Sequence, residues 1–100
     1  MSPFLKLTVI LSSTEWPLLE ELLLDHEAEG VTLSKVTGFG NYKNTFRNDL
    51  LSESFKVEIF TTKIKAEELA WLVVKFLKSH GNRPNHGFVA LMPVDELFNA

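Results

Sequence analysis

The sequence predicts an α+β fold in which four strands and two helices follow one another in the order βαββαβ. Short runs rich in apolar and β-branched residues occur at 5–11, 31–37, 55–61 and 88–93. Between the first two runs, and again between the last two, apolar residues recur at helical spacing. Two right-handed βαβ crossovers of this kind give a four-stranded antiparallel sheet with both helices on one face, which is the ferredoxin-like arrangement.

The first strand is expected at Leu5–Leu11, where polar and apolar residues alternate before the run becomes fully apolar. We expect Thr14 to be the N-cap of the following helix, because Pro17 is tolerated only in a first turn. Gly30 is expected to end this helix, since glycine accepts a positive φ. The buried stripe of the helix is predicted to be Leu18, Leu19, Leu22 and Leu23.

The second half of the chain contains the remaining elements. Strands are expected at Val31–Thr37, Phe55–Thr61 and Phe88–Pro93, and a helix at Lys65–Ser79. The buried stripe of that helix is predicted to be Leu69, Leu72, Val73, Phe76 and Leu77. The sheet face opposite the helices would carry apolar groups such as Val36 and Phe60. An uncovered apolar face implies a second subunit or a ligand.

Size and composition narrow the classes of protein to consider. One hundred residues form a single domain, 1–100, and a net charge of −3 argues against a nucleic-acid partner. The absence of cysteine removes disulfides, thiolate metal sites and cysteine nucleophiles. No signal peptide and no long apolar run is seen, so a cytoplasmic location is expected.

Two loops, 41–54 and 81–87, are candidates for a functional role. The segment 41–54 is predicted to be mobile and long enough to have a function. In it Lys43 and Arg47 are candidates to contact an anion or a partner, although solvation is the commoner role of such residues, and Phe46 is a candidate docking residue or packs on its own domain. The second loop, 81–87, is polar and bounded by glycines. We expect no metal site, since His80 and His86 lack a defined ligand spacing.

Several stretches resemble the nitrogen-regulatory PII family. Gly30–Gly40, which reads Gly-Val-Thr-Leu-Ser-Lys-Val-Thr-Gly-Phe-Gly, is similar to the second strand of that family. The similarity extends back to Leu7–Leu11 and resumes at Phe55–Ile59, after the position of the family's long T-loop. His80–Gly87 resembles its B-loop. The resemblance implies a non-enzymatic signalling homotrimer that binds an adenine nucleotide (ATP, ADP or AMP) between subunits. Its T-loop would regulate a partner such as a membrane transporter or an enzyme of nitrogen or carbon metabolism.

The resemblance also assigns candidate residues to the nucleotide. Those about the adenine would be Ile10, Gly30, Thr32 and Phe60, with the Thr32 hydroxyl directed at the ring. The floor of the site, where the T-loop begins, would be Gly38, Phe39 and Gly40. The phosphates would be held by Gly81, Asn82, Arg83, Asn85 and Gly87. Glycines allow backbone N–H groups to approach phosphate oxygens, and a guanidinium forks onto them.

The chain departs from the family at several positions. Tyr42 replaces a glutamine that helps to bind magnesium and 2-oxoglutarate, and it joins Lys43, Phe46 and Arg47 as a candidate partner contact. Ser54 stands in place of a lysine, Phe88 in place of a basic residue, and Val94–Ala100 contains no arginine. We therefore predict no 2-oxoglutarate sensing, no obligatory cofactor and no dependence on magnesium, with ADP or AMP binding as well as ATP.

Other functions of this fold are considered alongside. An acylphosphatase-like enzyme would need an arginine in the loop after the first strand, and Leu11–Thr14 has none. A metal-binding module would need thiolates or clustered histidines there. The remaining alternative is a small-molecule-binding or scaffolding module of the same fold that binds no nucleotide, for example a dimeric amino-acid sensor.

Overall fold

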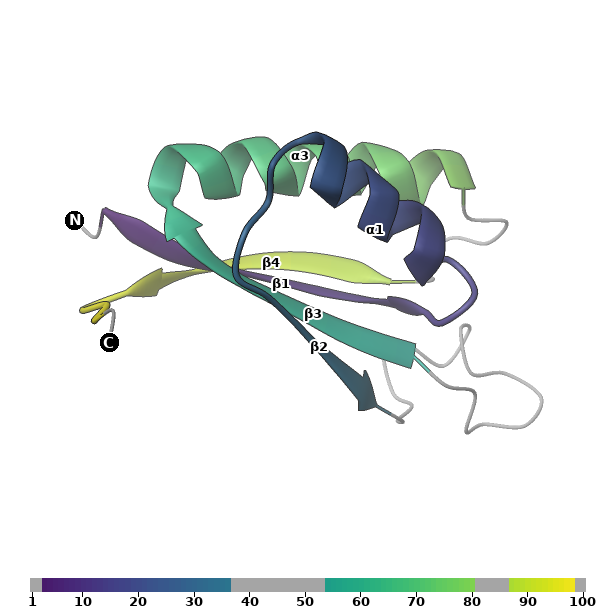
Figure 1. The fold of residues 1–100 in the computed structure, drawn as a ribbon, viewed down its shortest axis with the longest axis horizontal. Coiled ribbons are helices and arrows are strands. Elements are labelled where there is room, and N and C mark those ends of the chain that lie inside the picture. The colour runs from purple at the N-terminus through teal and green to yellow at the C-terminus, as the bar shows by residue number, and fades with distance from the viewer. Residues whose placement is uncertain (1–2, 37–53, 81–86, 99–100) are drawn as a thin grey trace.

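Four strands and two helices fold in the predicted order βαββαβ (Figure 1). The computed structural model describes residues 3–36, 54–80 and 87–98. The elements are β1 (Phe4–Ser12), α1 (Trp16–Asp25), β2 (Val31–Val36), β3 (Ser54–Thr62), α3 (Lys63–His80) and β4 (Phe88–Val94). Both helices lie on one side of the sheet, so the ferredoxin-like prediction is confirmed.

The sheet is antiparallel throughout, with the strand order β2-β3-β1-β4. β1 therefore lies between β3 and β4, and its register pairs Leu7 with Ile59 on one side and with Leu91 on the other. Because side chains alternate along a strand, this register sends every second residue of each strand to the helices and the others to the open face.

The core fills the space between the sheet and the two helices. Its fully buried members from the central strands are Leu7, Val9, Leu11, Val57 and Ile59. The helices contribute Leu19, Leu23, Leu69, Val73, Phe76 and Leu77. Each such side chain stabilises the fold by roughly 1.5–3 kcal/mol relative to leaving it exposed. In α1 the predicted stripe is too wide, since Leu18 is exposed and Leu22 only partly buried.

The start of α1 differs from the prediction. Glu15, not Thr14, is the N-cap, and it makes no side-chain capping hydrogen bond. The Thr14 amide donates instead to the Ser12 hydroxyl at 3.3 Å, and the Ser12 and Thr14 hydroxyls lie 2.9 Å apart. The Glu15 amide donates to the Ser12 carbonyl at 3.0 Å and so forms a turn over residues 12–15. Ser12 and Thr14 therefore belong to this turn, and the helix begins after it.

The end of α1 also differs. The helix stops at Asp25, and Glu27 takes a left-handed φ of 60°. The Glu27 amide donates to the Leu24 carbonyl at 3.0 Å, and the Ala28 amide donates to the Leu23 carbonyl at 2.9 Å. This pair of bonds is a Schellman motif. Gly30 does have a positive φ, 66°, but it lies just before β2 and not at the helix end.

Smaller boundary differences follow from hydrogen bonding. α3 begins at Lys63, whose amide donates to the Pro3 carbonyl, two residues earlier than expected. Ser54, assigned to the 41–54 loop by sequence, is the first residue of β3 and is fully buried. No helix among the described residues is long and apolar enough to cross a bilayer.

Candidate functional site

The sheet face opposite the helices is open and mixes apolar with charged residues. Its large apolar members include Phe60, Phe88 and Met92, which are 46%, 37% and 51% exposed. At its centre the Lys6 ammonium lies 3.3 Å from the Glu58 carboxylate, and both side chains are largely buried. A face of this composition on a single chain implies that something covers it.

Three residues predicted to surround an adenine ring come from different strands of this face. The register pairs Ile10 of β1 with Lys56, whereas Thr32 of β2 pairs with Glu58. Phe60 follows two residues after Glu58 on β3. All three side chains therefore lie on one face, as the alternation predicts.

Ile10 and Thr32 do not meet within one chain. β3 lies between their strands, which separates them by about 10 Å, two strand spacings, before any offset along the strands is counted. Gly30 stands at the entry to β2, where a β-carbon would meet no atom within 4 Å. Ile10 and Thr32 therefore lie on the same face without being neighbours.

Gly87 is held against β1. A β-carbon at this position would collide with the carbonyl oxygen of Ile10, and the carbonyl carbon of Ile10 and the Cα of Leu11 would lie 3.4 and 3.5 Å away. The last residue of the candidate phosphate loop 81–87 is thus seated on the backbone of a candidate adenine residue. Only glycine fits this approach without a shift of backbone.

Lys56 was not singled out by sequence reasoning. It is the cross-strand neighbour of Ile10, whose carbonyl contacts Gly87. Lys6 is engaged with Glu58, whereas Lys56 makes no ion pair with any described residue. The alternation of Lys56, Glu58 and Phe60 along one face was visible in the sequence and could have indicated this lysine. Lys56 and Gly87 lie on opposite sides of Ile10, because Lys56 is on β3 and Gly87 precedes β4.

Ser54 is the first residue of β3 and lies at one end of the open face. It pairs with Ser12 on β1 and with Val36 on β2. Its hydroxyl is buried and has no hydrogen-bond partner among the residues that the structure describes. A buried hydroxyl without a partner is costly and therefore uncommon.

The predicted contact residues that lie outside the described ranges are Gly38, Phe39, Gly40, Tyr42, Lys43, Phe46, Arg47, Gly81, Asn82, Arg83 and Asn85. His80 is described, and its ring stacks on Phe76 with a centroid distance of 4.4 Å. Its Nδ1 lies 3.1 Å from the Phe76 carbonyl oxygen, so the side chain is occupied at the end of α3. Within the described ranges, no three His, Asp or Glu side chains gather as metal ligands.

Comparisons with known proteins agree with this geometry. The PII protein of Arabidopsis thaliana, solved bound to citrate, is 25% identical with a TM-score of 0.73, over 93% of this chain and 78% of that one. A DUF3240-family protein from Shewanella baltica OS155 has the same fold, with a TM-score of 0.73 at 17% identity, over 100% of this chain and 99% of that one. Comparison with curated proteins gives no match. The family model described as "Nitrogen regulatory protein P-II" matches residues 4–99, and the chain therefore belongs to the nitrogen regulatory protein P-II family.

Proposed function

We propose that the protein is a signalling homotrimer that binds an adenine nucleotide between subunits and regulates a partner, such as a transporter or an enzyme, through segment 41–54. Membership of the P-II family supports a signalling role without chemistry of its own. The Arabidopsis PII structure is bound to citrate, a small polyanion, which supports an anionic effector for this chain as well.

The observation that carries the proposal is the seat of Gly87 on the Ile10 carbonyl. It fixes the end of the loop 81–87 next to Ile10 of β1, with Lys56 of β3 on the other side of that strand. Backbone N–H groups of a glycine-bounded loop suit phosphate oxygens, and the long Lys56 side chain adds opposite charge on the same open face. The apolar Ile10 side chain points to the same face and is 6% exposed in one chain.

The exposed apolar surface of the open face supports the trimer. Phe60, Phe88 and Met92 expose apolar surface there, and Ile10 and Thr32 are not neighbours within one chain. Packing these faces together would bury that surface and could bring Ile10 of one chain to Thr32 of the next. Light scattering during gel filtration is expected to give three times the 11.4 kDa mass of one chain.

Titration calorimetry with AMP, ADP and ATP tests the nucleotide. We expect one site per chain and a weaker affinity for Arg83→Ala, while Lys63→Gln on the helix side serves as the charge-loss control. If none of the three nucleotides gives saturable heat with a folded trimer, the proposal that the protein binds an adenine nucleotide is refuted. The alternative module that binds no nucleotide would then describe the protein better.

A further inference from the structure

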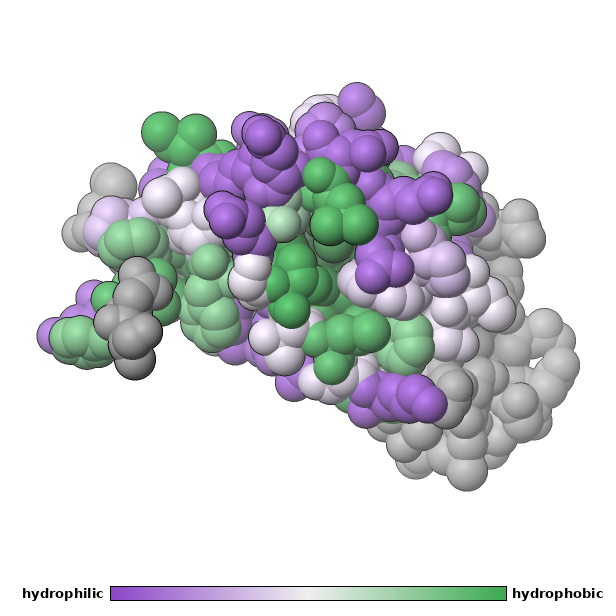
Figure 2. All heavy atoms as spheres, in the orientation of Figure 1, coloured by the Kyte–Doolittle hydropathy of each residue, from purple (hydrophilic) through white to green (hydrophobic). Residues whose placement is uncertain are grey.

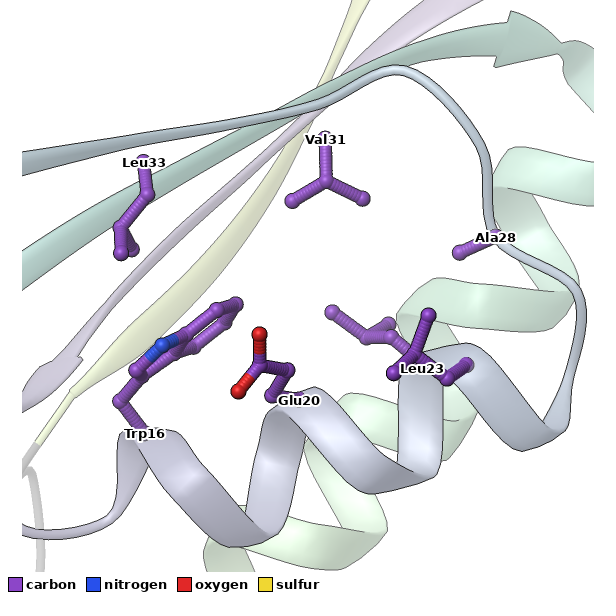
Figure 3. Close-up of a pocket in the computed structure, with 7 residues that line it drawn as sticks. Trp16, Glu20, Leu23, Ala28, Val31 and Leu33 are labelled. Atoms are coloured by element: carbon purple, nitrogen blue, oxygen red, sulfur yellow. The ribbon is translucent and has the colours of Figure 1, made fainter.

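A hollow lies on the helix side of the sheet, between α1 and β2, on the opposite side of β2 from the Thr32 side chain. Its volume is about 210 Å³. Figure 3 shows Trp16 and Glu20 along one wall, both from α1, with Val31 and Leu33 pointing toward them from β2. Leu23 and Ala28 lie at the end where α1 turns toward β2.

The walls are apolar and partly uncovered. Leu24 is 66% exposed, and Val31 and Leu33 are also exposed although they face the helix layer. The space-filling view shows apolar side chains gathered in the middle of this face with polar residues around them (Figure 2). This combination is typical of a ligand site, where an apolar body is bound and a few polar groups fix its orientation.

One wall of the hollow is held in place by the core. Trp16 packs edge-on against Phe55 of β3, with ring centroids 6.3 Å apart and planes at 88°. The Schellman motif at the end of α1 fixes Leu23 and Ala28 through the 2.9 Å hydrogen bond between their backbones. The hollow is therefore built from a fixed indole and a fixed helix end.

Charge selects the ligand class. The Glu20 carboxylate is directed into the hollow next to the Trp16 ring (Figure 3). Along the chain from Ser12 to Gly30 there are six acidic residues and no lysine or arginine. Lys65, which reaches the end of α1, is occupied: its ammonium donates to the His26 carbonyl at 2.7 Å and lies 3.4 Å from the Glu68 carboxylate. An aromatic face beside a carboxylate attracts an organic cation.

We propose that the α1–β2 hollow binds a small organic ammonium ion, its charged end at Glu20 and Trp16 and its apolar body against Val31, Leu33 and Leu23. Since an apolar cavity of roughly 150 Å³ holds benzene, this hollow accepts a body of about eight to ten non-hydrogen atoms. β2 separates this site from the open face, because Val31 and Leu33 point to the hollow and Thr32 to the other side.

The probes are 2-phenylethylamine, its neutral isostere 2-phenylethanol and the anion 3-phenylpropionate, at pH 7. Trp71→Phe leaves Trp16 as the sole tryptophan and reports on the hollow, since Trp71 is exposed on α3 and lines no part of it. We expect saturable quenching or a shift of Trp16 emission by the amine. The alcohol is expected to bind about tenfold more weakly and the carboxylate more weakly still.

Glu20→Gln keeps the shape of the side chain and removes its charge. In the Trp71→Phe background it is expected to weaken the amine about tenfold and to leave the affinity for the alcohol unchanged. The matched control is Glu21→Gln, the next residue of α1, which is exposed and does not line the hollow. Amide NMR shifts confined to α1 and β2 would add support.

Equal affinity for the amine and the alcohol, or an equal effect of the two glutamine variants, would refute the charge recognition. If the amine does not change Trp16 emission, the site is refuted. This holds also where the reason is that a second chain or a partner covers the hollow. Neither result bears on the nucleotide, which is measured on the opposite face by calorimetry.

Discussion

Gly87 lies so close to the carbonyl oxygen of Ile10 that no side chain fits between them. The constraint that the structure shows at Gly87 is one of space. Gly30 presents the opposite case, with a φ of 66° and no atom within 4 Å of a β-carbon. These two glycines are required for different reasons, and substitution can separate the reasons.

Gly87→Ala is expected to lower the free energy of unfolding by about 1–3 kcal/mol, because the β-carbon must displace the backbone of Ile10. It should also weaken nucleotide binding if the loop 81–87 holds the phosphates. Urea unfolding followed by circular dichroism measures the first effect, and calorimetry measures the second.

The comparison is with Gly30. Gly30→Ala is expected to cost about 1–2 kcal/mol through its positive φ alone, and Gly30→Asn less, because asparagine tolerates that region and there is room for its side chain. Gly87→Asn should be at least as harmful as Gly87→Ala. If Gly87→Asn is clearly more stable than Gly87→Ala, the contact between residue 87 and the Ile10 carbonyl is not tight in solution.

Glu27 occupies the position of the Schellman motif that glycine usually fills, with a φ of 60°. Glu27→Gly is expected to raise the free energy of unfolding by up to about 1 kcal/mol, because relief of the left-handed backbone exceeds the added entropy of the unfolded chain. Thermal and urea unfolding measure the change. The control is Glu29→Gly, two residues after Glu27, where no positive φ is relieved and a small loss of stability is expected.

The same region shows where sequence reasoning reached its limit. The order of elements that periodicity predicts is correct. The apolar residues that repeat along β1, β3 and α3 are the ones that form the core. Thr14 and Gly30 were assigned as helix caps by residue preference alone. In the structure other hydrogen bonds form at both positions. The Ser12 hydroxyl accepts from the Thr14 amide, and the two Schellman hydrogen bonds form around Glu27.

The candidate site divides in a similar way. Alternation placed Phe60 on the open face, where the structure has it, and the family resemblance supplied Ile10 and Thr32. The role of Lys56 depends on which residue of β1 it pairs with, and that register is a tertiary property. The approach of Gly87 to Ile10 joins residues 77 positions apart and left no local signal.

Ser54 provides a test of the buried end of the open face. Its hydroxyl is buried without a hydrogen-bond partner in the described part of the chain, so Ser54→Ala is expected to leave stability unchanged or to raise it by about 1 kcal/mol. Ser12→Ala is the control, since the Ser12 hydroxyl accepts from the Thr14 amide and its loss should be destabilising. A loss of more than about 1 kcal/mol for Ser54→Ala would mean that its hydroxyl has a partner in solution.

Lys56 is expected to contribute to nucleotide affinity by its charge. It is the neighbour of Ile10, which contacts Gly87, and makes no ion pair with a described residue. Lys56→Gln should therefore weaken ADP and ATP binding about tenfold, and AMP less, since fewer phosphate charges are neutralised. Lys63→Gln, which breaks an exposed pair with Glu67 on α3, is the control for loss of one positive charge. Calorimetry at two salt concentrations checks the result. A general field effect would weaken both variants equally and fade with salt, whereas a local phosphate contact would weaken only Lys56→Gln.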